Sequence, residues 1–273
     1  MLASQRQARI VEEIRHGGGV RVSDLTELLG VSDMTVRRDL EVLARAGVLH
    51  KVHGGAVLAT SRRTDEPGFA AKSALQQPAK EAIAARAAEL ITPGTAIALS
   101  AGTTTWTLAR HITAIPELTV VTNSTTVADI LEAQAPRAGF TVILTGGVRT
   151  PSAALVGPVA DQSIASLHVD QLFIGMHGMD AAAGLTTPNL AEAQTNRALI
   201  NSAKEVVVLA DSTKWGIVGL ADFGPLSTAD VLITDNGLPP AAHDILAEAV
   251  GELIVVDAAD TGIPSAPSVG DRT

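Results

Sequence analysis

The sequence of 273 residues contains no cysteine, and aromatic residues make up only 2% of it. The absence of cysteine excludes a disulfide framework and any thiolate metal site, which is typical of a protein of the reducing cytoplasm. No apolar run reaches the length that a membrane-spanning helix needs, and the polar start of the chain predicts no signal segment. Because hydrophobic residues still reach 46%, we expect a sizeable core built from aliphatic side chains.

Charge is distributed unevenly along the chain, whose net charge is −9. Residues 1–63 hold ten Lys and Arg against seven Asp and Glu, whereas residues 64–273 hold ten against twenty-two. The first part is therefore basic and the remainder strongly acidic. This asymmetry predicts that only the first part contacts nucleic acid, with modest non-specific affinity because the acidic part repels phosphate.

Two short helices joined by a tight turn are predicted near the N-terminus, after an earlier helix over about residues 6–15. Ser23 precedes an apolar run at helical spacing and is a good N-cap for the first of the two. Gly30 accepts the left-handed backbone that ends a helix, and Ser32 is a good N-cap for the second. The buried stripes are expected from Leu25, Leu28 and Leu29 and from Val36, Leu40 and Leu43.

Short polar and basic side chains gather at the start of the second helix, at Ser32, Thr35, Arg37 and Arg38. The N-terminal part of a recognition helix is the part that meets base edges in the DNA major groove. There, arginine binds guanine through two hydrogen bonds, while serine and threonine contact bases or phosphates. These four residues are our candidates for DNA contact.

A β-hairpin is predicted after the second helix, which we expect Gly47 to end. Val48, Leu49 and Val52 fit two short strands around residues 50–51, and residues 54–55 follow as a glycine pair. Lys51 and His53 would lie on this wing, near the DNA backbone or the minor groove. A plain surface role is the alternative for both.

An isolated pair of arginines would indicate no more than the solvated face of an ordinary helix. In this chain, the caps, the turn glycine, the buried stripes and the hairpin all fit one motif, the winged helix-turn-helix. The combination therefore favours a domain that binds double-stranded DNA.

Strands and helices alternate in the rest of the chain. Strands are predicted over residues 96–99, 119–121, 141–144, 171–174, 206–209, 231–234 and 253–256, and helices over 80–90, 104–112, 125–133, 159–167, 191–203 and 241–249. This alternation predicts an α/β domain with a mostly parallel sheet flanked by helices.

Four segments follow from these patterns. We expect residues 1–57 to form the winged helix-turn-helix, 58–78 a linker, and 79–257 the α/β domain. Residues 258–273 are rich in Pro, Ser and Gly, which predicts a disordered tail.

In open α/β sheets, ligands bind beyond the carboxyl ends of the strands. After the first strand of the α/β domain comes Gly102, followed by three threonines that open a helix. Free N–H groups and the helix dipole favour anions there, although the segment matches neither the dinucleotide fingerprint nor the P-loop. Further candidate residues follow later strands, at Asn123, Ser124, Gly146, Gly147, Arg149, Asp211 and Lys214.

Taken singly, each of these residues has a structural explanation, such as a capped helix start or a surface lysine. Taken jointly, they favour a site for a polyhydroxylated, phosphorylated small molecule. Lys214 and Arg149 would balance the phosphate charge, while Asp211, Asn123 and Glu192 would hold sugar hydroxyls. A purely structural role for the whole set remains the alternative.

The motifs together resemble the DeoR family of bacterial sugar-metabolism regulators over about residues 5–256. The segment SDMTVRRDLEVLARAGVLHKVHGGA is similar to that family's DNA-binding signature. The motifs AGTTT, TNS, TGG, GLT, DSTKWG and LITD occur later in the chain, in the same order as in the family. The resemblance implies a winged helix-turn-helix joined to a sensor domain similar in fold to ribose-5-phosphate isomerase. It also implies a homo-oligomeric repressor whose effector is a phosphorylated sugar or polyol.

The resemblance also implies a set of effector ligands, which are Gly102, Thr103, Thr104, Thr105, Asn123, Ser124, Gly146, Gly147, Asp211 and Lys214. Two positions depart from the family pattern. Ser100 stands where members often have an acidic residue, and Asn196 stands where they often have a lysine. Nothing in the sequence indicates a metal or a cofactor.

Three functions are compatible with these observations. The first is a repressor whose sensor binds a sugar phosphate. The second is a sugar-phosphate isomerase with a DNA-binding appendage, although the chain lacks an evident general-base constellation and likeness of fold does not by itself carry function. The third is a constitutive DNA-binding protein with a vestigial sensor, which the departures at Ser100 and Asn196 suggest.

Overall fold

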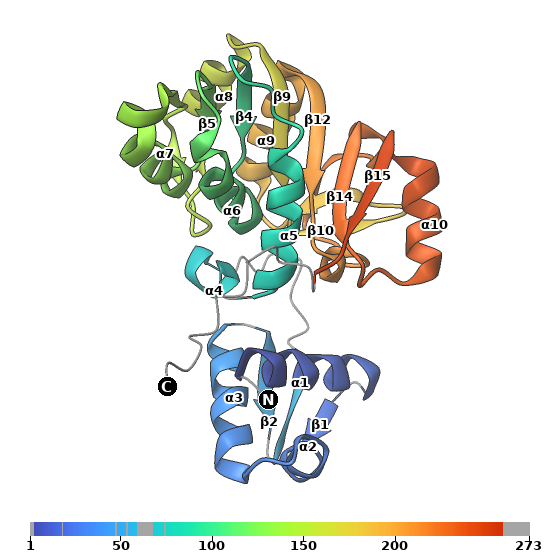
Figure 1. The fold of residues 1–273 in the computed structure, drawn as a ribbon. Coiled ribbons are helices and arrows are strands. Elements are labelled where there is room, and N and C mark those ends of the chain that lie inside the picture. The colour runs from blue at the N-terminus through green and yellow to red at the C-terminus, as the bar shows by residue number, and fades with distance from the viewer. Residues whose placement is uncertain are drawn as a thin grey trace, which may run out of the picture. The chain divides into compact units, whose positions relative to one another are not determined.

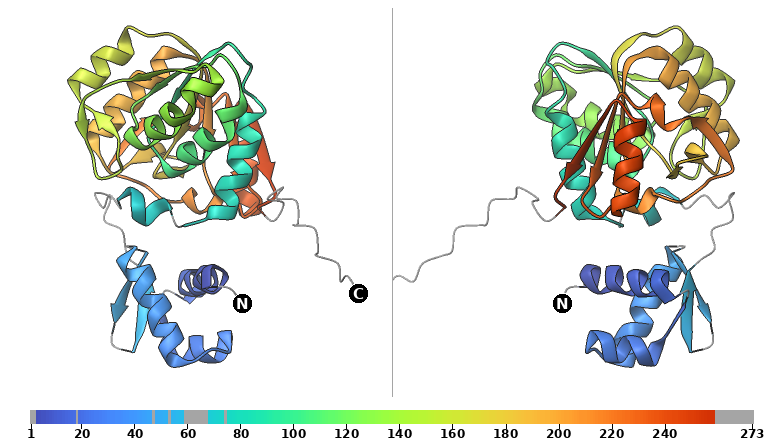
Figure 2. Two further views of the ribbon diagram at one scale, coloured as in Figure 1. Left: turned by 60° about the vertical axis from the view of Figure 1, so that its left-hand side comes forward. Right: turned by 90° about the vertical axis from the view of Figure 1, so that its right-hand side faces the viewer.

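The computed structural model describes residues 3–17, 19–46, 48–52, 54–58, 68–73 and 75–258. The chain divides into two compact units, Met1–Leu75 and Gln76–Thr273 (Figure 1 and Figure 2). Each unit is built around hydrophobic clusters of its own. Within the described ranges, no helix combines the length and the apolar character needed to cross a membrane.

The first unit is a winged helix-turn-helix. Its elements are α1 (Ala3–Gly17), β1 (Gly19–Arg21), α2 (Val22–Leu29), α3 (Asp33–Arg45), β2 (Leu49–Val52), β3 (Gly55–Leu58) and α4 (Phe69–Ser73). The strands form an antiparallel sheet in the order β1-β3-β2, in which β2 and β3 are the wing. Ile10 of α1, Leu25 of α2 and Leu40 of α3 pack with Leu49 of the wing into one core.

The turn between α2 and α3 is confirmed, but the predicted start of α2 is wrong. Gly30 ends α2 with φ +62°, and the Ser32 side chain caps α3. The residue before α2 is Arg21, which makes no side-chain cap. Because β1 pairs with β3 as far as Arg21 and Gly55, the helix starts directly where the strand ends. Ser23 lies inside the helix, and its hydroxyl donates to the Asp24 carboxylate.

The hairpin is displaced from its predicted position. Lys51 lies within β2 opposite Ala56 rather than in a turn, and the left-handed residue that follows the strand is Gly54, with φ +77°. The strand continues because Leu49 and Ala56 are both buried in the core of the unit. Gly47, predicted to end the helix, lies outside the described residues, and α3 ends at Arg45.

The second unit is an α/β domain. Its helices are α5 (Gln77–Ala88), α6 (Thr103–His111), α7 (Thr125–Ala138), α8 (Pro158–Ala165), α9 (Leu190–Ser202) and α10 (Pro240–Ala249). Its central strands are β4 (Ala96–Leu99), β5 (Thr119–Thr122), β6 (Thr141–Leu144), β9 (Val169–Gly175), β12 (Ala203–Leu209), β14 (Val231–Asp235) and β15 (Glu252–Val256). All neighbouring pairs are parallel, in the order β15-β14-β12-β9-β4-β5-β6. The predicted parallel sheet is confirmed.

Helices cover both faces of this sheet (Figure 1). Successive residues of a strand point to opposite faces, so Leu99 of β4 packs with α5, α6 and α7, whereas Ala98 packs with α8, α9 and α10. Because aromatic residues are few, the core consists mainly of Ala, Val, Leu and Ile, and Phe173 is the largest fully buried side chain.

Several short elements have no counterpart in the sequence predictions. They are β7 (Val148–Arg149), β8 (Leu155–Val156), β10 (Gly178–Asp180), β11 (Gly184–Thr187), β13 (Ala221–Gly224) and the 3-10 turns η1 (Ile112–Ala114), η2 (Ser212–Lys214) and η3 (Leu226–Thr228). The strands among them form an antiparallel ribbon, β7-β8, and a small antiparallel sheet, β10-β11-β13. The segment predicted as a linker, 58–78, contains α4 and the start of α5, while 59–67, 74 and 259–273 lie outside the described residues.

Candidate DNA-binding face and effector site

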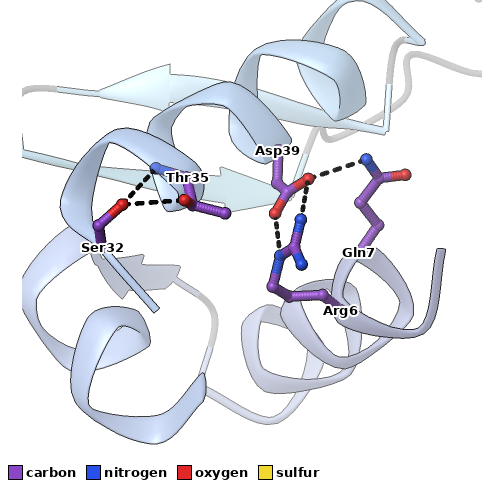
Figure 3. Close-up of polar contacts among 5 residues, drawn as sticks. All are labelled: Arg6, Gln7, Ser32, Thr35 and Asp39. Carbon is purple, nitrogen blue, oxygen red and sulfur yellow. Dashed lines mark hydrogen bonds and ion pairs between the residues drawn. The ribbon is translucent and has the colours of Figure 1, made fainter. Parts of the chain in front are cut away.

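The candidate DNA-contact residues of the first unit begin with the cap of α3. The Ser32 hydroxyl accepts a hydrogen bond from the Thr35 N–H at 3.3 Å and lies 2.9 Å from the Thr35 hydroxyl (Figure 3). This reciprocal contact satisfies an N–H group that the helix leaves unpaired. Ser32 is exposed and Thr35 is half-buried, so both lie at the surface in the first turn of α3.

The two adjacent arginines differ in their surroundings, although the sequence treats them as a pair. The Arg37 guanidinium contacts the Asp33 carboxylate through Nε at 2.5 Å and Nη2 at 3.3 Å. This hydrogen-bonded pair raises the pKa of Arg37 above its ordinary value. Arg38 is equally exposed, yet it has no hydrogen bond or ion pair within the described part of the chain.

The wing residue Lys51 projects from β2 toward α3. Its Nζ lies 3.6 Å from Glu41 Oε1, and the other Glu41 oxygen lies 3.7 Å from Arg45 Nη2. One exposed carboxylate therefore links the recognition helix to the wing. His53, the second wing candidate, lies outside the described residues.

A buried carboxylate that the sequence did not single out fixes the recognition helix. Asp39 is only 4% exposed and accepts hydrogen bonds from the Arg6 guanidinium and from Gln7 Nε2, the latter at 3.0 Å (Figure 3). The hydrogen bond between Arg6 and Asp39 raises the pKa of Arg6 above its ordinary value. Because the partners lie 32 and 33 residues away, no local pattern could have indicated this contact, which holds α3 against α1.

In the second unit, strand order reverses between β4 and β9. The chain first forms β4, β5 and β6 toward one edge of the sheet, and then adds β9, β12, β14 and β15 on the other side of β4. Loops that leave the carboxyl ends of β4 and β9 diverge in opposite directions, which is where open α/β sheets bind ligands. Ser100 and Gly175 meet at this point, because the Ser100 hydroxyl accepts the Gly175 N–H at 3.1 Å.

The glycine turn after β4 leads into the predicted anion site. Gly102 precedes α6 and has no side chain to cap it, so the first N–H groups of the helix stay available to a ligand. Thr105 donates to the Gly102 carbonyl at 3.0 Å. Within the described chain, the hydroxyls of Thr103 and Thr104 make no hydrogen bond, although the residues are only 9% and 7% exposed. These two hydroxyls fit a bound polar ligand.

Asn123 and Ser124, after β5, are buried and already occupied. Asn123 accepts the Ala101 N–H at 2.9 Å and donates to the Leu155 carbonyl at 3.2 Å. Ser124 caps α7 by accepting the Val127 N–H. Their first role is therefore to hold the loops after β4 and β5 together, so that one amide hydrogen of Asn123 is left for a ligand.

After β6, the two glycines and Arg149 lie in the segment leading to the β7-β8 ribbon. Gly146 and Gly147 have φ +74° and +116°, and a Cβ on Gly147 would lie 2.6 Å from the Val156 carbonyl oxygen. Close approach of the ribbon backbone therefore requires glycine at 147. Arg149 is exposed and makes no ion pair in the described ranges.

The loop after β12 carries the remaining candidates. Asp211 is 1% exposed and caps η2 by accepting the N–H and the hydroxyl of Thr213. Asp235, which ends β14, accepts the Ser212 N–H at 2.6 Å and hydroxyl at 2.9 Å. The two carboxylates thus shape the loop that presents Lys214. Lys214 is half-buried and has no ion-pair partner among the described residues.

Asp235 belongs to the LITD motif but was not predicted as a site residue, and Glu192 was expected to hold sugar hydroxyls. In the structure, Glu192 accepts hydrogen bonds from protein hydroxyls instead, those of Thr150 at 2.8 Å, Ser152, and Thr187 at 3.1 Å. A carboxylate with three hydroxyl partners is a structural centre that joins α9 to the segment between β7 and β8 and to the end of β11. Asn196, on the same helix, is half-buried.

The polar groups of this edge are cations, hydroxyls and buried carboxylates. Lys214, Arg149 and the start of α6 are positive, whereas the buried carboxylates are turned toward N–H and hydroxyl groups of the protein. In the described part of the chain, no cluster of three or more His, Asp and Glu side chains is arranged to bind a metal. The arrangement can hold an anion and hydroxyl groups.

Comparisons with known proteins agree with both units. The DeoR-like helix-turn-helix domain matches residues 6–62, and the DeoR C-terminal sensor domain matches residues 75–236. The HTH-type transcriptional regulator GlpR of Haloferax volcanii is 36% identical over 93% of this chain and 98% of its own. The transcriptional repressor AccR of Agrobacterium fabrum is 34% identical over 85% of this chain and 89% of its own.

The chain therefore belongs to the DeoR family of helix-turn-helix transcriptional regulators, as its motifs predicted. Solved structures that match include ribose 5-phosphate isomerase A from Neisseria gonorrhoeae, with 14% identity and a TM-score of 0.37 over 53% of this chain and 55% of that one. This likeness concerns the fold alone, and we draw no argument about activity from it.

Proposed function

We propose that the protein is a cytoplasmic repressor of carbohydrate-metabolism genes that leaves its operator when a phosphorylated sugar or polyol binds the sensor unit. One observation carries the proposal. In the segments that follow β12 and β6, Lys214 and Arg149 have no carboxylate partner in the described residues, and the start of α6, which follows β4, is uncapped. Positive groups left without partners at the same edge of the sheet as available hydroxyls favour a phosphorylated polyol over a neutral sugar.

The proposed ligand contacts follow from the occupancy of the side chains. Thr103, Thr104 and the first N–H groups of α6 receive the phosphate, together with Lys214. The free amide hydrogen of Asn123 and the second carboxylate oxygen of Asp211 hold hydroxyls. Gly102 and Gly147 keep the backbone close, whereas Thr105 and Ser124 act by shaping the loops.

Regulation would operate by a population shift, because the ligand and the operator favour different states of the same protein. A coupling free energy of about 1–3 kcal/mol would change operator affinity about 5- to 150-fold. We propose that two copies of the chain act together, so that two recognition helices address half-sites about 34–36 Å apart.

We propose further that the protein catalyses no reaction. Both oxygens of Glu192 and both of Asp235 accept hydrogen bonds from the protein, which supports structural rather than general-base roles. Turnover of a sugar phosphate by the purified protein would contradict this part of the proposal.

The test is operator binding at fixed salt, since affinity for DNA falls steeply as salt rises. Fluorescence anisotropy with the DNA upstream of the protein's own gene is measured with and without a panel of sugar and polyol phosphates. We expect one compound to weaken binding in the wild type but not in Lys214→Gln. Lys204→Gln, which removes an exposed lysine outside the site, should respond like the wild type. Specific binding that no compound changes would contradict the sensor role.

A further inference from the structure

Only some of the polar residues of α3 lie at the centre of its exposed side. Val36, Leu40 and Leu43 define the buried side. At 100° per residue, Met34 and Arg38 stand almost opposite that side, one turn apart. Arg37 lies at the flank of the exposed face, next to Asp33.

Arg37 and Arg38 therefore have different tasks. Arg37 is engaged by Asp33 through two nitrogen–oxygen contacts, so binding a guanine would require breaking a charge-assisted pair. Arg38 is exposed, central and without a partner in the described residues. Its five N–H donors are available for the two acceptors, N7 and O6, that guanine presents in the major groove.

Met34 is the other unexplained feature of this face. It is 76% exposed, the highest exposure among the large hydrophobic side chains of the described chain. The flexible thioether lies in the first turn of α3, the part of a recognition helix that reaches base edges. The apolar group that the major groove offers is the C5 methyl of thymine.

We propose that Met34 and Arg38 are the residues of α3 that determine operator sequence, Met34 by contact with a thymine methyl and Arg38 by hydrogen bonds to a guanine. Arg37 contributes only sequence-independent attraction to phosphate. The two reading side chains are about 6 Å apart along the helix axis, so the thymine and the guanine lie within about two base pairs of each other. The inference rests on the proposed DNA-binding function.

The experiment uses the full chain and a duplex that it selects from a randomised pool. Each thymine of the selected duplex is replaced in turn by uracil, which removes only the methyl group, and each guanine by 7-deazaguanine, which removes only N7. With the wild type, we expect one uracil position per half-site to weaken binding about fourfold, the worth of one buried methyl group. Replacement of one guanine per half-site by 7-deazaguanine should weaken binding more than the uracil replacement does.

Variants assign these positions to side chains. Met34→Ala should lose the uracil effect and keep the 7-deazaguanine effect, whereas Arg38→Ala should bind about 5- to 100-fold more weakly and show the reverse pattern. Arg37→Ala should weaken selected and unrelated duplexes alike and reduce the salt dependence. Lys204→Ala, which removes an exposed positive charge in the second unit, is the control.

The outcomes separate the two proposals. If no duplex is enriched from the pool, the proposed function fails. If a duplex is enriched but its uracil and 7-deazaguanine effects persist in Met34→Ala and Arg38→Ala, or follow Arg37→Ala instead, this assignment is overturned and the proposed function stands. Equal melting temperatures of the variants, expected because all three side chains are exposed, exclude unfolding as the cause.

Discussion

Most candidate residues are exposed in the first unit and buried in the second. In the first unit, Ser32, Arg37, Arg38 and Lys51 are exposed on a helix and a strand. In the second unit, Thr103, Thr104, Thr105, Asn123, Ser124 and Asp211 are buried, in the first turn of α6 and in loops at one edge of a sheet, whereas Lys214 is half-buried and Arg149 exposed. The difference fits the two ligands that we propose, double-stranded DNA and a small-molecule effector. A DNA duplex is met by a protruding face, whereas a small molecule must be surrounded by groups whose positions are already fixed.

The buried carboxylates sharpen this contrast. Asp39 in the first unit is neutralised by a cation, Arg6. Asp211 and Asp235 in the second are held by N–H and hydroxyl groups alone. The carboxylates of the second unit therefore leave Lys214 without an ion-pair partner among the described residues, whereas Asp39 is paired with Arg6.

The largest effect is expected from breaking the buried pair of the first unit. Asp39→Ala leaves Arg6 without a partner, and such a loss is among the costliest single changes. We expect the melting temperature of the N-terminal unit to fall by about 15 °C, measured by circular dichroism. Asp33→Asn is the matched control, because it removes an exposed partner of Arg37 and should change the melting temperature little. Equal effects would show that burial of Asp39 is not decisive.

The next largest effect is expected at the backbone of the candidate effector site. Gly147→Ala places a methyl group against the Val156 carbonyl in a left-handed conformation, and should lower the free energy of unfolding by about 3 kcal/mol. Gly146→Ala also has a positive φ, +74°, but meets only the Val159 side chain at 3.5 Å, so about 1 kcal/mol is expected. Urea unfolding of both variants tests whether close backbone approach, and not φ alone, demands glycine at 147.

Removal of the unpaired cation should act on binding and not on stability. Lys214→Gln is expected to weaken binding of the effector about 10- to 100-fold, which corresponds to the loss of one charge-assisted hydrogen bond. The melting temperature should not change. Isothermal titration calorimetry with the compound that releases the operator measures the loss. A comparable loss in Lys204→Gln would instead indicate a general effect of net charge.

The smallest effect is expected at Asp180, the last residue of β10. Hydrogen bonds from the Ala183 and Ala182 N–H groups lower the pKa of its carboxyl. Its contribution to stability is therefore complete above the ordinary carboxyl pKa and is lost as pH falls through the lowered one. Asp180→Asn should melt about 1–2 °C below the wild type at pH 7, a small difference because the group is half-exposed. The difference should disappear near pH 2.

Local patterns predicted the elements that local forces determine. The apolar runs of the seven strands, the left-handed turn at Gly30 and the cap at Ser32 can all be recognised from residues a few positions apart. The small sheet β10-β11-β13 was missed because its strands, rich in glycine and polar residues, form only by pairing with each other. The incorrect start of α2 has the same origin, since β1 ends where its pairing with distant β3 ends.

The candidate site was predictable as a set of loops but not as a set of contacts. Strand ends indicated where polar residues would gather. Which of those residues stay available depends on partners far along the chain, such as the hydroxyls that occupy Glu192 from 40 and 42 residues away. Likewise, the inequality of Arg37 and Arg38 depends on one neighbouring aspartate and could not be derived from the arginine pair alone.

The strand order also has a consequence for biosynthesis. All strand pairings of the first unit are closed within residues 19–58, so a ribosome completes them early. Strand β4, by contrast, receives its second neighbour only when β9 emerges, because Ala98 pairs with Leu172. Until then one edge of a fully apolar strand stays open, which is the condition under which nascent chains associate wrongly. We expect the DNA-reading unit to be finished first and the sensor to be the part that depends on chaperones.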